Sequence, residues 1–128
     1  MLDLIQNPWL LGAGIAAGVT ALLHVFAGGP EIVGPLLRSK DIHDVSKYVN
    51  YYCWHLVSVT LVAMSVGFIW PAFDPDQTGL AIMWTVVAVS FCVWSIGLVV
   101  WKRQNPWHMP QWLLFAVISC PAVIGVVS

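Results

Sequence analysis

Four long runs without a single charged residue divide this chain, and they constrain its fold more than any motif does. The runs are Leu4–Pro30, Tyr48–Phe73, Gln77–Trp101 and Gln104–Ser128, which hold 27, 26, 25 and 25 residues. A helix needs about 20 residues to cross the roughly 30 Å hydrocarbon core of a bilayer, so each run is long enough to span it. Lipid offers no water to unpaired backbone groups, and the runs lack the alternating polarity of barrel strands, so we expect helices.

The composition supports a lipid environment for these helices. Hydrophobic residues make up 59% of the chain and charged residues 9%, whereas roughly a quarter of a soluble domain is charged. A soluble domain of this size has too much surface for its volume to hide so many apolar side chains. We therefore predict one domain over residues 1–128, an all-α integral membrane four-helix transmembrane bundle with antiparallel up-down neighbours. The predicted helices cover roughly residues 8–28, 48–70, 78–101 and 109–127.

Helix punctuation sets these boundaries. Asn7-Pro8 is typical of an N-cap followed by proline in the first turn. Gly28-Gly29-Pro30 is expected to end the first helix, and Trp70-Pro71 the second. In the first loop, apolar residues recur at helical spacing after Ser39, which predicts one short interfacial segment or a cytoplasmic extension of the second helix. These apolar residues are Ile42, Val45 and Val49.

The basic residues predict an orientation in the plasma (inner) membrane. All five fall in the first and third connections, which share one side of a four-helix topology: Arg38, Lys40, Lys47, Lys102 and Arg103. By the positive-inside rule these two loops are cytoplasmic, and both termini are periplasmic or extracellular. The expected partners are the lipid bilayer and either a larger membrane complex or a homo-oligomer. With a net charge of −1 the chain lacks the basic footprint of a nucleic-acid binder.

Small and polar residues at helical spacing predict the faces that meet inside the bundle, since close backbone approach is how membrane helices associate. In the first helix we expect internal packing rather than a dimer interface on this face. Bulky aromatic residues of the third helix are expected to face lipid: Trp84, Phe91, Trp94 and Trp101. The expected interior residues are Gly14, Ala17, Ala21, His24 and Gly28 in the first helix, Tyr48, Tyr51, His55, Ser58, Val62 and Ser65 in the second, and Ala81, Thr85, Ala88, Cys92 and Ser95 in the third.

Two of the four histidines lie within predicted membrane spans. His24 lies seven residues before Glu31, and His55 lies eight residues after Lys47. In antiparallel neighbours these positions fall within roughly 1.5 Å of the same depth, about 10 Å inside the cytoplasmic charged boundary. His108 begins the fourth helix at the same face. An ionisable residue inside a membrane is a functional-site hypothesis by default.

Several ligands suit these histidines. Together, His24 and His55 could ligate haem b axially. With His108 they form a candidate copper or zinc site. They could also hydrogen-bond a quinone headgroup, with Tyr51 and Trp54 lining a cofactor-binding pocket. We therefore predict a small inner-membrane protein with a histidine-centred binding site near the cytoplasmic face, accessory to a larger membrane complex.

Other hypotheses stay open. Neutral histidines hydrogen-bond across helices as ordinary glue, and Thr20, Ser58 and Ser95 are available partners, so the chain could be a purely structural membrane subunit. A small oligomeric channel or transporter is a further alternative. An enzyme ranks last, because no His-Glu-x-x-His, phosphate loop or nucleophile elbow occurs, and catalytic residues are therefore not assigned.

Overall fold

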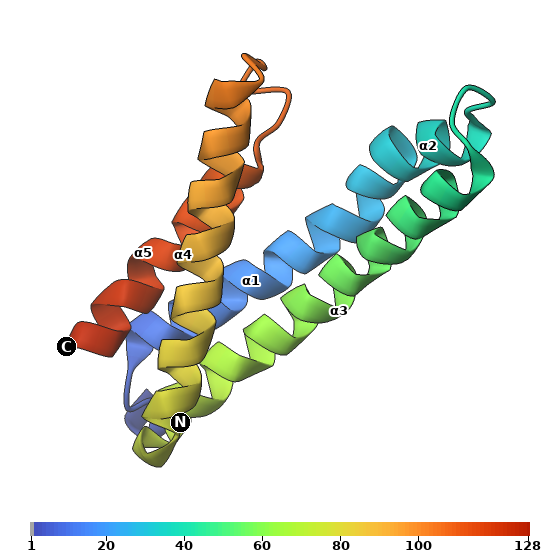
Figure 1. The fold of residues 1–128 in the computed structure, drawn as a ribbon. Helices are drawn as coiled ribbons and strands as arrows, with labels where there is room; N and C mark the ends of the chain where they lie inside the picture. The colour runs from blue at the N-terminus through green and yellow to red at the C-terminus, as the bar shows by residue number, and fades with distance from the viewer. Residues whose placement is uncertain (1) are drawn as a thin grey trace.

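The computed structural model describes residues 2–128, and in this part of the chain every regular element is a helix (Figure 1). Three of them are long and apolar enough to cross a membrane, and the fourth apolar helix has 17 residues. The longer elements are α1 (Pro8–Phe26), α3 (Asp44–Phe73), α4 (Thr78–Trp101) and α5 (Gln111–Val127). The short ones are η1 (Leu2–Leu4), η2 (Gly29–Val33), α2 (Gly34–Arg38) and η3 (Pro75–Gln77).

The helices form two antiparallel hairpins that meet at one end. The helix α3 runs back along the segment from α1 to α2, and α5 runs back along α4. In addition, α1 packs along α5, so it is the central helix of the assembly. In Figure 1 the hairpins diverge from the end that holds both termini toward the α2–α3 and α4–α5 connections. The termini therefore lie at the same end of the molecule.

Asn7 joins three helices at the end that carries the termini. It caps α1 as predicted, because its Oδ1 accepts from the Leu10 amide at 3.2 Å. Its Nδ2 donates to Gly125 O of α5 at 2.8 Å. The amides of Gln6 and Asn7 both donate to Ala72 O, at 2.8 and 3.0 Å. One short segment thus ties the start of α1 to the ends of α3 and α5.

The first α-helix ends at Phe26, two residues before the predicted stop at Gly28-Gly29-Pro30, but the helical path does not stop there as expected. Both Gly28 and Gly34 have right-handed helical dihedrals, and the chain continues through the π-helical η2 into α2. Pro30 sits in the first turn of η2, where a missing amide proton removes no required hydrogen bond. The helical path from Pro8 therefore reaches Arg38, a total of 31 residues.

The prolines of α3 and α5 are also accommodated inside their helices. Pro71 lies within α3, which ends at Phe73 rather than at Trp70. In the other direction α3 begins at Asp44, which is the predicted extension of the second helix into the first connection. Pro121 lies within α5, whose first residue, Gln111, follows Pro110. The extension of both helices reduces the first connection to residues 39–43.

The core is concentrated at the end that carries the termini. Its largest fully buried side chains are Leu61, Met64, Phe68 and Ile118. Two glycines allow the helices to approach there. A Cβ on Gly14 of α1 would lie 2.5 Å from Ile69 Cγ1 of α3, and a Cβ on Gly67 would overlap the Trp84 indole of α4. Gly14 is therefore used in internal packing, as predicted.

The predicted faces agree with the structure for α1 and α4 and only in part for α3, where Ser65 Oγ donates to Gly14 O of α1 at 2.7 Å. Gly14, Ala17 and Ala21 are buried in α1, and Ala81, Thr85 and Ala88 are buried in α4, as predicted. In α3, however, Tyr48, His55 and Val62 are exposed, and the buried face carries Leu61, Met64, Phe68 and Ala72 instead. Large apolar side chains fill the space that the small residues of α1 leave open.

Two aromatic residues of α4 were also assigned to the wrong face. Trp84 and Phe91 pack against the core rather than facing outward. The Trp84 indole occupies the place opened by Gly67, and the Phe91 ring meets Phe115 edge-on at 5.3 Å. Trp94 and Trp101 are exposed, as predicted.

Candidate functional site

His24 and Trp54 form a stacked pair between α1 and α3, away from the main core. Their ring centroids are 3.8 Å apart and the ring planes differ by 20°. His24 Nε2 lies 3.1 Å from Trp54 O, and because a carbonyl oxygen can only accept, Nε2 carries the proton. The same carbonyl accepts from Ser58 Oγ at 3.3 Å. His24 therefore joins α1 to α3 in two ways: the face of its ring stacks on the Trp54 indole, and its Nε2–H donates to the Trp54 carbonyl.

Gly28, one turn beyond His24, makes room for the indole. A Cβ at this position would lie 2.6 Å from Trp54 Cη2, a distance that real Cβ contacts do not show. Together the His24 ring and the bare backbone of Gly28 bracket Trp54 against the end of α1. The glycine that sequence analysis assigned to a helix stop instead provides a contact surface for an aromatic ring.

The second histidine of the predicted pair, His55, is at the predicted position along the hairpin but in a different environment. Since His24 contacts Trp54, the neighbour of His55, the two histidines lie at one level along the hairpin. The His55 side chain is exposed, and its ring meets Tyr51 edge-on with centroids 4.8 Å apart. The interior position expected for His55 is therefore wrong, because α3 turns Trp54 rather than His55 toward α1.

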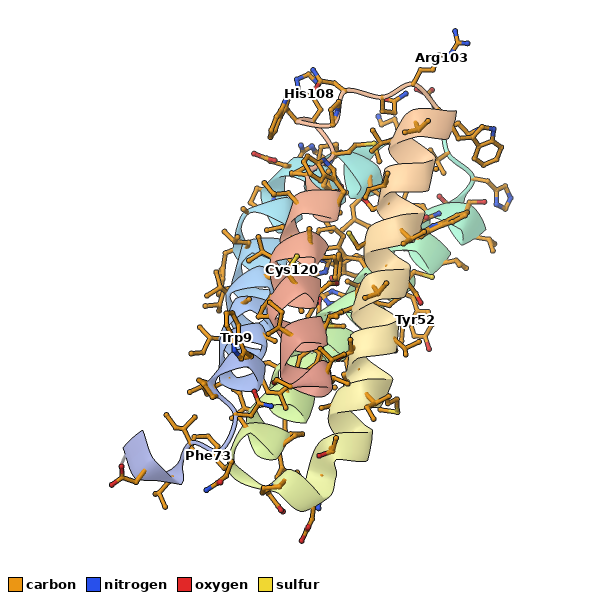
Figure 2. The ribbon with its side chains drawn as sticks, turned by 90° about the vertical axis from the view of Figure 1, so that its left-hand side faces the viewer. Trp9, Tyr52, Phe73, Arg103, His108 and Cys120 are labelled. Carbon is orange, nitrogen blue, oxygen red and sulfur yellow. The ribbon has the colours of Figure 1, made fainter. Side chains whose placement is uncertain are left out.

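His108 lies in the α4–α5 connection, where its side chain is exposed and its amide donates to Asn105 O at 3.0 Å (Figure 2). Within residues 2–128, no three side chains of the His, Cys, Asp and Glu types come together as a metal site. The copper or zinc site of His24, His55 and His108 thus stays a prediction without a geometric counterpart.

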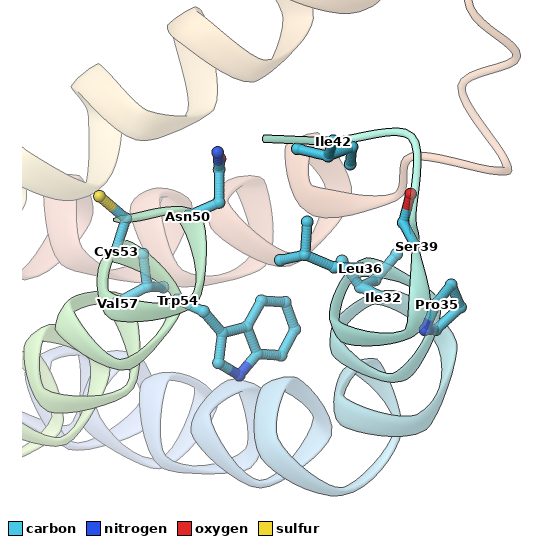
Figure 3. Close-up of a pocket in the computed structure, with 9 residues that line it drawn as sticks. All are labelled: Ile32, Pro35, Leu36, Ser39, Ile42, Asn50, Cys53, Trp54 and Val57. Atoms are coloured by element: carbon cyan, nitrogen blue, oxygen red, sulfur yellow. The ribbon is translucent and has the colours of Figure 1, made fainter. Parts of the chain in front are cut away.

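A groove of about 610 Å³ lies beside the stacked pair, between α2 and α3 (Figure 3). Trp54 forms part of its wall, so this one indole contacts His24 and also faces the groove. The remaining wall is mainly aliphatic. The lining residues are Ile32, Pro35, Leu36, Ser39, Ile42, Asn50, Cys53, Trp54 and Val57.

The polar groups of the groove are few and uncharged. Asn50 Nδ2 donates to Ser46 O at 2.7 Å, which leaves its second N–H and its carbonyl oxygen for a ligand. Ser39 Oγ accepts from the Asp41 amide at 3.3 Å, so its hydroxyl proton is available to donate. Cys53 adds a free thiol. An apolar cavity with a small number of placed donors is the usual form of a small-molecule site.

Of the two predicted pocket residues, Trp54 lines the groove and Tyr51 does not, and the α2 wall was not predicted. Ile32 and Leu36 are four residues apart and so share a helix face, and this signal was readable. The helix end expected at Gly28-Gly29-Pro30 excludes this face from the prediction. The described lining residues include neither a carboxylate nor a histidine.

Comparisons of the chain with protein-family models, with curated proteins and with solved structures give no match. Function is therefore inferred from the groove and from the His24–Trp54 pair beside it.

Proposed function

We propose that this chain is an integral protein of the plasma (inner) membrane that binds a quinone-type ligand in the groove between α2 and α3. The four apolar helices would cross or enter the bilayer, with α5 the shortest at 17 residues. The basic α2–α3 and α4–α5 connections would be cytoplasmic by the positive-inside rule, and both termini would be periplasmic or extracellular. The groove then opens near the cytoplasmic headgroup layer, where a lipid-soluble ligand can enter sideways.

The observation that carries this proposal is the indole of Trp54, held between His24 and the groove. A quinone head is a flat ring with a carbonyl oxygen at each end, so it needs an aromatic wall and hydrogen-bond donors. Trp54 supplies the wall, while the free N–H of Asn50 and the hydroxyl of Ser39 are the candidate donors. The aliphatic lining of α2 suits a prenyl tail.

Haem and metal ligation are less well supported by the same residues. Axial haem ligation needs two imidazole nitrogens aimed at one iron, whereas His24 Nε2 is engaged with Trp54 O and the His55 ring packs on Tyr51. In this proposal His24 acts indirectly, by fixing the Trp54 indole. Tyr51 and His55 are outside the groove lining.

Binding of a short-chain ubiquinone analogue to the purified full chain in lipid nanodiscs tests this proposal. We expect saturable binding that Trp54→Leu weakens about tenfold or more, because a stacked aromatic contact and its area are lost. Trp94→Leu, at an exposed position of α4, is the matched control and should change the dissociation constant less than twofold. Equal affinities in the wild type and Trp54→Leu would contradict the proposal.

A purely structural membrane subunit is the second candidate, and the bond from His24 Nε2 to Trp54 O favours it. Interhelical hydrogen bonds of this kind contribute about 0.6 kcal/mol on average in membrane proteins. His24→Phe keeps a ring on Trp54 and removes the bond. Under the structural hypothesis this variant loses stability while the wild-type protein shows no quinone binding; under the quinone hypothesis both the stability and the quinone affinity fall.

A further inference from the structure

We propose that the connection between α4 and α5, residues 101–108, binds the phosphodiester headgroup of an anionic phospholipid. The inference rests on the proposed membrane insertion but is independent of the quinone site, which lies on the other hairpin. Three observations carry it: the charge balance of the two connections, the folded form of this turn, and its exposed indoles.

The two connections at this end of the molecule differ in net charge. Around the α2–α3 connection three basic residues are balanced by three acidic ones, Glu31, Asp41 and Asp44, and the one ion pair within residues 2–128 joins Lys47 to Asp44 at 3.9 Å. The α4–α5 connection contains Lys102 and Arg103, and no acidic residue follows Asp76 in the sequence. Only the second connection therefore has uncompensated positive charge.

This connection is a folded turn with two exposed cations, one extending outward and one lying over an indole. Arg103 has a φ of 52° and is exposed, and Figure 2 shows its side chain extending away from the helices. The Asn105 side chain accepts from the Trp107 amide at 2.9 Å, and Lys102 Nζ lies 4.1 Å from the Trp101 ring centroid. Both charges are therefore presented by an ordered backbone.

Exposed indoles flank the two cations. Trp101 and Trp107 are each 69% exposed. The Trp107 ring rests edge-on against Trp112 with centroids 5.8 Å apart, and Trp112 Nε1 donates to Pro106 O at 3.0 Å. Indoles settle at the level of lipid headgroups, where Lys and Arg meet the phosphates of anionic lipids.

A lipid headgroup fits this surface better than a dissolved phosphate. Two exposed cations in water hold a free anion weakly, because its hydration competes with them. A lipid phosphate is already concentrated at the membrane surface, and its acyl chains can pack along the exposed apolar faces of α4 and α5. The shared chemistry is the phosphate, and the tethered acyl chains distinguish its source.

Lipid adducts of the full-length chain, measured by native mass spectrometry from detergent with equimolar phosphatidylglycerol and phosphatidylcholine, test this inference. Each cation near the surface gives about a fivefold preference for anionic lipid, so we expect about 25-fold for the wild type. K102Q/R103Q should bring the ratio of the two adducts close to one. R38Q/K40Q removes the same charge from the balanced connection and should leave most of the preference in place.

Several outcomes would overturn the inference. These are a wild type without preference, a K102Q/R103Q variant that keeps the wild-type ratio, or an R38Q/K40Q variant that loses as much. Displacement of phosphatidylglycerol by excess inorganic phosphate would also contradict it, since it would mark a site for the free anion. Should K102Q/R103Q lose helicity by circular dichroism, the single variants K102Q and R103Q, each with about a fivefold loss, decide the matter.

Insertion is checked separately. A chain that alkaline carbonate extracts from vesicles would contradict both the proposed function and this inference. A chain that stays in the membrane and binds quinone, yet shows no lipid preference, would contradict this inference alone.

Discussion

The two ends of the molecule are held together by different means. At the end that carries the termini, α1, α3, α4 and α5 close around Met64, Phe68 and Ile118, all of them fully buried. At the other end the hairpins diverge, and Trp54 of α3 contacts the end of α1 through His24 and Gly28. Both α1 and α3 belong to the two regions: the N-terminal part of α1 and the C-terminal half of α3 are core, whereas His24 of α1 and the N-terminal half of α3 lie at the open end.

This difference separates stability from binding. Where small residues let four helices meet, large apolar side chains are fully buried and packed against one another. Where the hairpins part, the helices keep exposed faces, and a groove with uncharged polar groups remains beside Trp54. We therefore expect substitutions at the packed end to change stability and substitutions at the open end to change binding.

The largest effect is expected from Gly67→Leu at the packed end. The new side chain must displace the Trp84 indole, and overpacking of this kind lowers the free energy of unfolding by about 3 kcal/mol. Gly97→Leu is the matched control in α4, because a Cβ there meets nothing within 4 Å. Thermal or SDS-induced unfolding in detergent measures both, and equal stabilities would contradict the assigned α3–α4 contact.

A smaller loss is expected from Asn7→Ala. This variant removes both the cap on Leu10 N and the bond to Gly125 O, which together contribute about 1–2 kcal/mol. Asn105→Ala removes a similar side-chain bond, to the Trp107 amide, from the exposed α4–α5 turn. Its expected loss is below about 0.5 kcal/mol. If the same unfolding assay ranks the two variants in the opposite order, Asn7 does not join the three helices.

The sequence was sufficient for part of this comparison. Charge-free runs are a consequence of apolar surroundings, so the four main helices and the shared end of both termini followed from them directly. The Asn7 cap and the buried face Gly14, Ala17 and Ala21 were readable because local capping and close approach depend on residue type. Burial of Ala81, Thr85 and Ala88 followed for the same reason.

The open end was predicted less well, for identifiable physical reasons. Pro30 does not end its helix, because the wider π turn of η2 places it where no amide proton is needed. Because a helix end is expected at Pro30, the sequence does not predict the α2 residues that form one wall of the groove. The polarity of His55 predicts an interior position. Trp54 and Leu61, however, present larger apolar surfaces to α1, so these two side chains occupy the interior instead. The position of His24 along the hairpin was predictable from helix rise, but its stacking partner, the Trp54 indole, was not.

Gly28→Ala tests how tightly the open end is packed, because it introduces a steric clash there. The added Cβ lies 2.6 Å from the tip of the Trp54 ring, and this ring can tilt into the groove rather than deform a core. We expect a stability loss of about 1 kcal/mol or less, with weaker quinone binding. Gly12→Ala, where a Cβ meets nothing within 4 Å, should preserve both. A loss as large as that of Gly67→Leu would show that the open end is rigidly packed as well.

The smallest effect is expected from His55→Gln. Its side chain is exposed and contacts the Tyr51 ring edge-on, so the free energy of unfolding should change by less than about 0.5 kcal/mol. Quinone affinity should be unaffected, because His55 is outside the groove lining. A visible absorption spectrum after incubation with haemin provides a further check, and a haem band that His55→Gln abolishes would favour the haem hypothesis instead.

Alkylation of the native cysteines with and without quinone tests whether the groove between α2 and α3 binds the ligand. Cys53 lines the groove at the open end, whereas Cys120 is exposed on α5, away from it. Peptide mass spectrometry after digestion of the chain, treated beforehand with a small maleimide in nanodiscs, follows both sites in one sample. We predict that a ubiquinone analogue slows alkylation of Cys53 in proportion to its occupancy and leaves Cys120 unchanged. An unchanged rate at Cys53 under saturating quinone, or equal slowing at both cysteines, would contradict the assignment of the groove as the binding site.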